Sequence, residues 1–309
     1  MDDGAHSRPV VFLPGMHWKT SKREIDLTCP RVMAILNVTP DSFSDGGRFA
    51  DADAAVRHAE RLIGEGADIL DIGGESTRPG SSRVSVDEEI SRVVSVIEAV
   101  VKRFDIPISV DTSKSQVARA ALDAGAEIIN DVSGLRFDPL LAQSAAESNA
   151  GLVLMHSRGE FESMHSQPPV DDILAVVAAD FRRAVQEAAA AGVGREQIVL
   201  DVGIGFGKTL DQNLELIAKL DKLKSEFPDY PIMVGTSRKS FIGKLLDNVG
   251  PDQRSAGSLA TAVVAAWNGA DILRVHDVRA TVDAVKMVAA IRKADQADSE
   301  PLPYANTGI

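Results

Sequence analysis

Short apolar segments recur eight times along the chain, and each gives way abruptly to polar or charged residues. Each segment has the length and near-continuous apolarity of a strand that is covered on both faces, as in a parallel sheet. The segments, with the polar residues that follow them, are Val32–Leu36 (Asn37), Ile69–Leu70 (Asp71), Ile108–Val110 (Asp111), Ile128–Ile129 (Asn130, Asp131), Leu152–Met155 (His156), Ile198–Leu200 (Asp201), Ile232–Val234 (Ser237, Arg238, Lys239) and Ile272–Leu273 (Arg274, His276). Because parallel α/β folds carry their chemistry at the carboxyl ends of the strands, the polar ends predict one ring of functional groups.

Amphipathic helical stretches lie between the apolar segments. The clearest cover residues 86–101, 211–223 and 278–291. Ser85 and Glu88 have the spacing of a capping box at the first of them. The predicted apolar stripes are Ile90, Val93, Val94, Ile97 and Val101, then Leu214, Ile217, Leu220 and Leu223, then Val282, Val285, Val288 and Ile291. Glycine is expected just past a helix end, and it stands there at Gly66, Gly125 and Gly269.

This repeated strand–loop–helix order predicts an α/β protein made of a single (β/α)8 TIM barrel, with a doubly wound open sheet as the alternative. We divide the chain into an N-terminal extension (1–31), a catalytic barrel (32–293) and a C-terminal tail (294–309). The extension is expected to hold a short extended pair near residues 19–27.

Composition narrows the class of protein. The single cysteine, Cys29, excludes an internal disulfide and a cysteine-based zinc site, and it fits a reducing compartment, so we expect a cytoplasmic protein. The first residues lack the basic and apolar regions of a secretory signal, and no apolar run approaches the roughly 20 residues of a membrane span. The net charge of −12 argues against a sequence-independent nucleic-acid binder.

Two long loops follow the first two predicted strands. In residues 37–47, Asn37 offers an amide oxygen to a hard cation, and proline and glycine favour a loop that closes over a substrate. In residues 71–80, Arg78 is able to meet an anion. A plain turn and a solvated arginine are the structural alternatives.

Asp111, Asn130 and Asp201 end three of the apolar segments. Buried carboxylates are costly unless they are paired with donors, and this set suits a flat heterocycle with a ring N–H and an exocyclic amine. The alternative is that these residues hold one another and their loops. The glycine-rich run 203–209 is not a nucleotide cradle, because Val202 and Lys208 stand where the Walker A and dinucleotide motifs need glycine.

Cations gather at the last two predicted strand ends. Residues 237–240 (Ser-Arg-Lys-Ser) open a helix, whose N-terminus favours anions. Arg274 and His276 alternate along a strand and therefore face the same side of the sheet. Together they predict a phosphate site, although His276 alone is better explained as a structural histidine.

These motifs, taken in order, resemble one enzyme family. The set NVTPDSFSDGG, GGESTRPG, SVDTSK, INDVSG, GIGFGKT, TSRKSF and RVHDV resembles the dihydropteroate synthases and spans residues 32–291. The resemblance implies a transferase of folate biosynthesis and a sulfonamide target. Such an enzyme joins 6-hydroxymethyl-7,8-dihydropterin pyrophosphate to 4-aminobenzoate and releases pyrophosphate. It also implies a homodimer through helices at the C-terminal end of the barrel. The net charge and the lack of a long apolar run predict no nucleic-acid or membrane partner.

The resemblance further implies roles for individual residues. The pterin ring is expected to contact Asp111, Asn130, Asp201 and Lys239. Mg²⁺ is expected on Asn37, and the phosphates on Arg274 and His276; with Asp111 and Lys239 these form the predicted catalytic set. The aminobenzoate site is expected to include Phe206, Lys239, Ser237, Thr77, Arg78 and Pro79, with Phe43 and Asp45 on the closing loop.

The implied chemistry is a dissociative substitution. Pyrophosphate leaves once its charge is neutralised, and the CH₂ beside the electron-rich pterin remains as a stabilised cation. A neutral aniline then attacks this carbon without needing a strong base. Val202 departs from the family's usual proline, which predicts weaker pterin binding. Two alternatives stay open: a pterin-binding methyltransferase domain and a non-catalytic pterin-binding paralogue. Neither needs the full set of Asn37, Lys239, Arg274 and His276.

Overall fold

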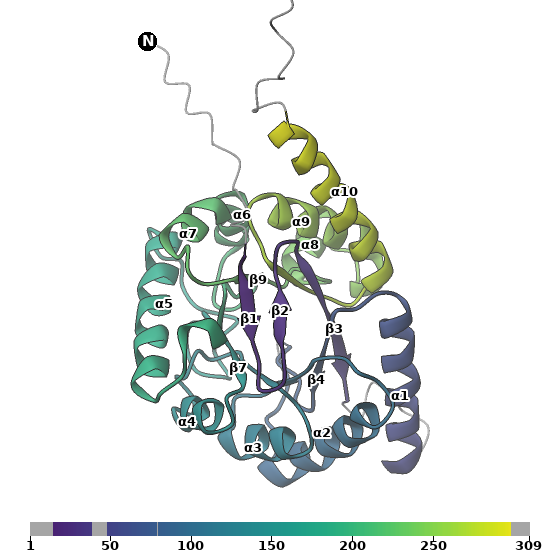
Figure 1. The fold of residues 1–309 in the computed structure, drawn as a ribbon. Coiled ribbons are helices and arrows are strands. Elements are labelled where there is room, and N and C mark those ends of the chain that lie inside the picture. Colours follow the sequence, from purple (N-terminus) through teal and green to yellow (C-terminus); the bar gives the residue numbers. More distant parts are fainter. Residues whose placement is uncertain (1–14, 39–47, 79, 298–309) are drawn as a thin grey trace, which may run out of the picture.

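A closed barrel of eight parallel strands forms the centre of the molecule (Figure 1). The computed structural model describes residues 15–38, 48–78 and 80–297. The barrel strands are β3 (Arg31–Asn37), β4 (Ile69–Gly73), β5 (Ile108–Asp111), β6 (Ile128–Asp131), β7 (Gly151–Met155), β8 (Ile198–Asp201), β9 (Ile232–Val234) and β10 (Ile272–Val275). Each strand pairs with the next in sequence, and β10 closes the ring on β3. All eight predicted strands therefore form, which confirms the (β/α)8 barrel and excludes the open sheet.

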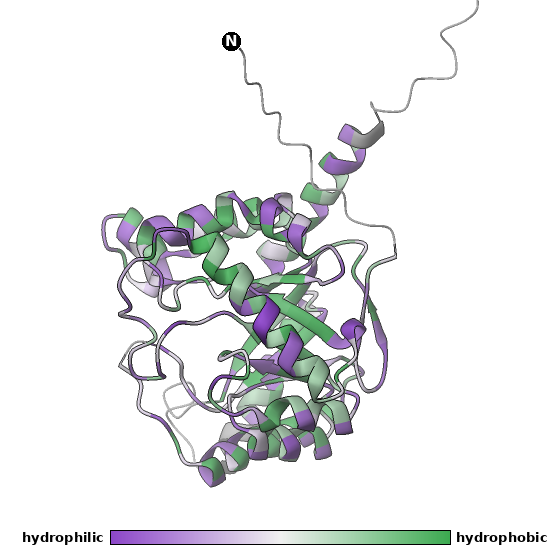
Figure 2. Ribbon diagram, turned by 90° about the vertical axis from the view of Figure 1, so that its left-hand side faces the viewer, coloured by the Kyte–Doolittle hydropathy of each residue, from purple (hydrophilic) through white to green (hydrophobic). Residues whose placement is uncertain are grey.

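Helices surround the barrel (Figure 1). They are α1 (Arg48–Gly64), α2 (Val86–Val101), α3 (Ser115–Asp123), α4 (Leu140–Glu147), α5 (Ile173–Ala190), α6 (Leu210–Ala218), α7 (Leu220–Glu226), α8 (Ser240–Leu245), α9 (Ser255–Trp267) and α10 (Val278–Ala297), with short 3-10 turns at Arg195–Gln197 and Pro251–Gln253. The strands are largely hydrophobic, whereas the helices carry mixed faces (Figure 2). Among the described helices, none is long and apolar enough to cross a membrane.

A two-stranded hairpin covers the amino ends of the barrel strands. Strands β1 (His17–Lys19) and β2 (Glu24–Asp26) are antiparallel, and they form the extended pair expected in the extension. Trp18 is fully buried, and its indole nitrogen donates to the Gln197 carbonyl at 2.8 Å. Trp18 packs with Met33, Val153 and other inward-facing strand residues. This end of the barrel is therefore closed by a core, which leaves the opposite end for chemistry.

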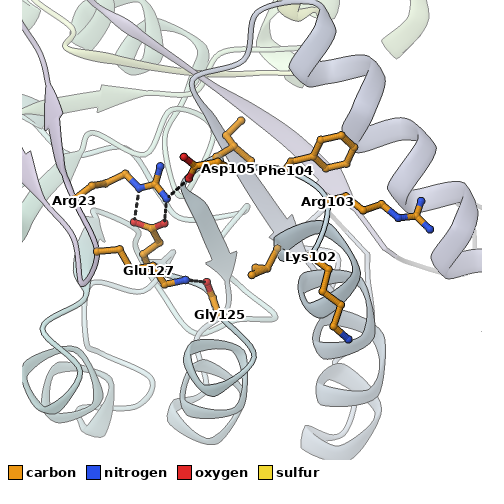
Figure 3. A pocket seen from close by; sticks show the side chains of 10 residues that line it. Arg23, Lys102, Arg103, Phe104, Asp105, Gly125 and Glu127 are labelled. Carbon is orange, nitrogen blue, oxygen red and sulfur yellow. Dashed lines mark hydrogen bonds and ion pairs between the residues drawn. The ribbon is translucent and has the colours of Figure 1, made fainter.

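A cavity of about 360 Å³ also lies at the amino ends of the strands, beside the hairpin (Figure 3). Arg23 bonds Glu127 and Asp105 across it, and Lys22 donates to the Gly125 carbonyl at 2.6 Å. Its charged groups thus tie the hairpin to the barrel. Groups at this face of a TIM barrel usually serve stability, so we do not place the active site here.

The helices correct three details of the predicted pattern. The helix predicted for 211–223 is broken at Lys219, whose backbone (φ −112°, ψ 25°) separates α6 from α7. Leu214 and Ile291 are 36% and 52% exposed, so neither belongs to its buried stripe. On α2 the buried stripe includes Val96 and Val100, which the prediction omitted, while Val101 is exposed.

Helix ends follow the predicted chemistry more closely. The Ser85 hydroxyl accepts from the Glu88 backbone N–H at 3.2 Å, as expected for a cap, while the Glu88 carboxylate pairs with Arg92. Gly66, Gly125 and Gly269 all have positive φ, between 101° and 114°, which confirms them as left-handed residues at helix ends. These residues reverse the chain between a helix and the strand that follows it.

Candidate active site

One arginine holds two carboxylates at the mouth of the barrel. Arg274 on β10 donates through Nε to Asp71 Oδ2 at 2.6 Å and through Nη2 to Asp111 Oδ2 at 2.5 Å. The two aspartates come from the neighbouring strands β4 and β5. Burial opposes the charge of Arg274, but the two carboxylates more than offset it and raise its pKa. The pair of carboxylates therefore keeps Arg274 charged and fixed in place.

Asp71 was missing from the predicted site, although its strand end was in the predicted ring. It is fully buried, and Asn130 Nδ2 donates to its Oδ2 at 3.1 Å. Its Oδ1 is buried without a hydrogen-bond partner among the described residues. Asp71 thus connects Asn130 with Arg274, and the structure unites three strand ends that the sequence could only place on one ring.

The pKa of Asp111 is raised to about 7, chiefly by burial. Arg274 opposes this shift, but Asp71 draws on the same guanidinium and its negative charge raises the pKa of Asp111 further. A carboxyl with a pKa near neutrality changes its charge within the working range of most enzymes. Asp111 is therefore a group whose protonation is set by its neighbours at this mouth.

Asp201 ends β8 and is held by its own turn. Its Oδ1 accepts from the Gly203 N–H at 2.8 Å. Gly203 has φ +63°, and a Cβ there would lie 1.9 Å from the His156 carbonyl oxygen, so only glycine fits. Val202 is fully buried in the outer core. The orientation of the Asp201 side chain is thus fixed by a hydrogen bond to Gly203 and by the turn that this glycine allows, although Val202 replaces the proline expected after this aspartate.

Lys239 precedes α8 and reaches over the β8–α6 loop. Its Nζ donates to the Ile204 carbonyl and lies 4.4 Å from the centroid of the Phe206 ring. Burial lowers the pKa of Lys239 to about 8, although the charge of Asp201 opposes the shift. The sequence placed Lys239 and Phe206 in one site, and the structure brings them into contact.

Ser237 and His276 form a pair. The Ser237 Oγ accepts from the backbone N–H of His276 at 3.1 Å and lies 3.0 Å from its Nδ1. The hydroxyl that accepts from this N–H can also donate to Nδ1, and with that arrangement the imidazole proton stands on Nε2. Burial and the nearby charge of Arg274 lower the pKa of His276 to about 3. His276 is therefore a neutral donor at this mouth.

The two cations predicted at the start of α8 diverge. Arg238 has φ +59° and pairs with Asp277 at 2.5 Å, and its backbone N–H bonds the Ser258 hydroxyl. Only Lys239 turns toward the β8–α6 loop. Ser240, the first residue of α8, is exposed, whereas Ser237 is buried against His276. Of the two serines at this helix start, Ser240 is therefore the one whose hydroxyl is exposed to solvent.

A second buried lysine orders the β8–α6 loop. Lys208 Nζ donates to the carbonyls of Gly203, Phe206 and His156 at 2.7, 3.0 and 3.2 Å. Burial lowers its pKa well below the ordinary value. Lys208 stands outside the predicted site residues, and its role as the centre of this loop has no sequence signal.

The β4–α2 loop is anchored at its base. Lys114 Nζ bonds Glu75 Oε1 at 2.8 Å and Glu89 Oε2 at 2.6 Å, and Glu75 Oε1 also accepts from the Val84 N–H. Thr77 and Arg78 lie farther along this loop, Thr77 partly buried and Arg78 exposed. Pro79, Phe43 and Asp45, with the rest of the predicted closing loop 39–47, lie outside the described residues.

Asn37 ends β3 opposite Gly73 of β4. A Cβ on Gly73 would lie 3.7 Å from Asp111 Oδ2 and 3.8 Å from Asn37 Oδ1. Because Gly73 has no side chain, a space remains beside it that Asp111 Oδ2 and Asn37 Oδ1 both border. Within the part of the chain that is described, no three His, Cys, Asp or Glu residues are grouped to hold a metal ion.

Comparisons with known proteins agree with this geometry. The family model "pterin binding enzyme" matches residues 33–276. Dihydropteroate synthase of Escherichia coli strain K12 is 48% identical over 274 residues, which is 88% of this chain and 95% of the relative. Xanthomonas albilineans dihydropteroate synthase, solved with 4-aminobenzoic acid, is 44% identical with a TM-score of 0.84, covering 93% of this chain and 99% of that one. The Yersinia pestis enzyme, solved with a sulfonamide drug complex, is 46% identical with a TM-score of 0.84 over 90% and 100% of the two chains. The chain therefore belongs to the pterin-binding enzymes and, within them, to the dihydropteroate synthases.

Proposed function

We propose that the barrel mouth carries out the reaction of the dihydropteroate synthases with the residues described above. In this reaction the CH₂ carbon of 6-hydroxymethyl-7,8-dihydropterin pyrophosphate loses its bond to a pyrophosphate oxygen and gains one to the nitrogen of 4-aminobenzoate. The amine gives up a proton, and pyrophosphate leaves. The observation that carries the proposal is the cluster of Asp71, Asp111, Asn130 and Arg274, of which Asp111 and Arg274 act by their charges on Lys239.

The pterin is assigned to Asp111, Asn130, Asp201 and Lys239. A pterin edge presents ring N–H and amine donors together with a carbonyl acceptor. Asp201 uses one oxygen for Gly203 and keeps the other for a ligand, while Lys239 supplies a donor. A buried site of this kind rejects ligands that leave its polar groups unpaired, which favours a pterin over an apolar ring.

The pyrophosphate is assigned to Arg274 and His276. Arg274 uses Nε and one hydrogen of Nη2 for the two aspartates, so Nη1 and the second hydrogen of Nη2 are left to donate to a phosphate oxygen. His276 donates through Nε2–H without a charge of its own. The two groups orient the leaving group, and the neighbouring start of α8 adds free backbone N–H groups.

Asn37 is the residue that would hold Mg²⁺. This cation is commonly bound by one or two protein oxygens together with substrate phosphates and water, and the space beside Gly73 offers the Asn37 oxygen in that way. When bound, Mg²⁺ would neutralise charge on the departing pyrophosphate. Asp111, at the same space, stabilises the positive charge that the pterin CH₂ develops.

The aminobenzoate is assigned to the wall formed by Phe206, Lys239, Thr77 and the start of α8. Its ring would stack near Phe206, and its carboxylate would lie at the start of α8 near Ser237, where Ser240 offers the exposed hydroxyl. Arg78, Pro79, Phe43 and Asp45 complete the assigned site on its loop side. The closing loops would exclude water from the cationic intermediate.

A homodimer is proposed through α8, α9 and α10. Large apolar side chains are exposed along these helices, and an exposed apolar patch commonly marks an interface. They are Leu245, Leu246, Val264, Trp267, Met287 and Ile291. The double variant Val264→Glu/Met287→Glu should halve the mass measured by sedimentation equilibrium. An unchanged mass would contradict this interface.

A reducing compartment, the cytoplasm, is the proposed location. Cys29 is a free, exposed thiol, and such thiols persist best where glutathione and thioredoxin keep them reduced. Labelling Cys29 with a thiol reagent in freshly lysed cells tests this. A thiol that is already blocked by a disulfide would contradict it.

The direct test of function is pyrophosphate release by the purified protein. Release should require both 4-aminobenzoate and Mg²⁺, yield 7,8-dihydropteroate, and fall when a sulfonamide is added. No release despite measurable pterin binding would favour the non-catalytic paralogue. Methyl transfer from methyltetrahydrofolate to a corrinoid protein would favour the methyltransferase.

A further inference from the structure

His165 lies in the β7–α5 loop, outside the predicted site. Its neighbours anchor this loop: Met164 and Phe161 are buried in a small apolar cluster with Met155 and Phe206. The His165 ring is partly exposed and extends from this cluster toward two other loops. The histidine therefore stands on a fixed base, and its ring position is set by what it contacts.

The ring of His165 joins three loops at the barrel mouth. Its Nε2 lies 2.7 Å from the Thr77 carbonyl oxygen on the β4–α2 loop, and its Nδ1 lies 3.2 Å from the Gly205 carbonyl oxygen on the β8–α6 loop. The ring also packs against Phe206, with centroids 5.2 Å apart and planes tilted by 36°. A neutral imidazole donates to one carbonyl at a time, whereas a protonated one donates to both.

Both loops that His165 contacts supply the wall assigned to 4-aminobenzoate. Phe206, on the β8–α6 loop, contacts both His165 and Lys239, since Lys239 Nζ lies 4.4 Å from the centroid of the Phe206 ring. Thr77 supplies the part of the same wall that comes from the β4–α2 loop. His165 thus sets the distance between Thr77 and Phe206.

The rest of each loop is held without His165. The β4–α2 loop is tied at its base by Glu75, Val84 and Lys114, and the β8–α6 loop is tied by Lys208. Loss of the imidazole would therefore free the rim of the site and leave the fold in place. This separation makes a role in positioning distinguishable from a role in stability.

We infer that His165 is a positioning residue that holds Thr77 and Phe206 in register and so sets the affinity of the site for 4-aminobenzoate. It does not touch the reacting atoms. The inference deepens the proposed function, since it rests on the assignment of this wall to 4-aminobenzoate. Asp71, Asp111 and Arg274, which are assigned to the pterin and the pyrophosphate, lie on strands β4, β5 and β10. The affinity for the pterin and the pyrophosphate should therefore not change when His165 is replaced.

Three substitutions at His165 test the inference. His165→Ala removes both bonds and the ring contact. His165→Gln keeps a donor near the position of Nε2 for Thr77, and His165→Asn keeps one near Nδ1 for Gly205. The matched control is His17→Gln, which changes an exposed histidine at the opposite end of the barrel.

We expect His165→Ala to raise the KM for 4-aminobenzoate about tenfold, the usual effect of losing a hydrogen bond or two. The KM for the pterin pyrophosphate and the Tm should stay as in the unchanged protein. His165→Gln and His165→Asn should give intermediate values, and His17→Gln should change nothing. A purely structural role would instead lower the Tm and raise both KM values together.

Binding measurements separate this inference from the proposed function. Calorimetry measures binding without turnover. The two ligands are 7,8-dihydropteroate, the product that contains both the pterin and the aminobenzoate, and free 6-hydroxymethyl-pterin. The variant His165→Ala should bind dihydropteroate about tenfold more weakly and the free pterin equally well. An unchanged affinity for dihydropteroate would overturn the role of His165, whereas a protein that binds neither compound would overturn the proposed function itself.

Discussion

Asp71 and Asp111, on neighbouring strands, share a single counter-ion, the guanidinium of Arg274. Two carboxylates on one cation cannot both be fully neutralised, so the charge of Asp71 raises the cost of ionising Asp111. This explains why the pKa of Asp111 is raised to about 7 by burial and by Asp71, even though Arg274 lies 2.5 Å away. The arrangement couples the charge of the active site to a residue that was absent from the predicted site.

Asp71→Asn should shift the acid limb of the pH profile. Removing the negative charge of Asp71 leaves Arg274 to Asp111 alone, so the pKa of Asp111 should fall below about 7. The measurement is kcat/KM against pH, and the acid limb should move to lower pH. Asp87→Asn, on the exposed side of α2, is the matched control. A limb that stays in place would show that another group limits the reaction in acid.

The unchanged protein should have a narrow optimum between about pH 7 and about pH 8. Below the lower value Asp111, whose pKa burial raises, becomes protonated and loses its charge; above the upper value Lys239, whose pKa burial lowers, loses its proton. Because kcat/KM reports the free enzyme, both limbs should appear in that parameter. Lys239→Arg keeps the charge at high pH and should remove the basic limb, at reduced activity.

Ser237→Ala should weaken the phosphate side of the site. Without the hydroxyl, Nδ1 of His276 loses its partner and the proton is no longer directed to Nε2. We expect kcat/KM for the pterin pyrophosphate to fall about tenfold, the usual cost of one buried hydrogen bond, with little change in the KM for 4-aminobenzoate. Ser91→Ala, on the outside of α2, is the control. A change confined to the KM for 4-aminobenzoate would instead show that Ser237 acts on that half of the site alone.

A stability prediction concerns the amino end of the barrel. Lys224 and Asp271 form a buried ion pair at 2.5 Å, and Asp271 Oδ2 also accepts from the Ile232 N–H. Lys224→Met would leave Asp271 buried without its cation, which typically costs about 3–5 kcal/mol in the free energy of unfolding. Urea denaturation measures it, with Lys222→Met on the same helix as the exposed control. A loss below about 1 kcal/mol would mean that Asp271 is satisfied by its other donors.

The sequence predicted the barrel well because burial on both faces of a strand leaves a continuous apolar segment. The polar residue after each segment then had to lie at one end of the barrel. What the sequence could not predict was the choice of partners around the ring. Arg274 looked like a free phosphate ligand, yet two of its nitrogens bind Asp71 and Asp111, which lie 203 and 163 residues away in sequence.

Local patterns failed where tertiary contacts decide the outcome. Leu214 fits the apolar stripe of a continuous helix, but α6 buries the face of Gln212, Asn213, Leu216 and Ile217, which leaves Leu214 exposed. Ser237 and Ser240 look equivalent in sequence, and only the position of His276 shows which hydroxyl is already engaged. His165 carries no motif at all, because its role depends on two carbonyls from loops far apart in the chain.

Lys239→Ala tests the central claim most directly, because Lys239 is assigned to both halves of the reaction. The variant should lose at least about a thousandfold in kcat/KM for both substrates, a scale typical of lost catalytic electrostatics. Its Tm should stay close to that of the unchanged protein, since Lys239 contacts a loop that Lys208 holds independently. Near-normal kcat/KM in this folded variant would contradict the account and move the reaction away from this barrel mouth.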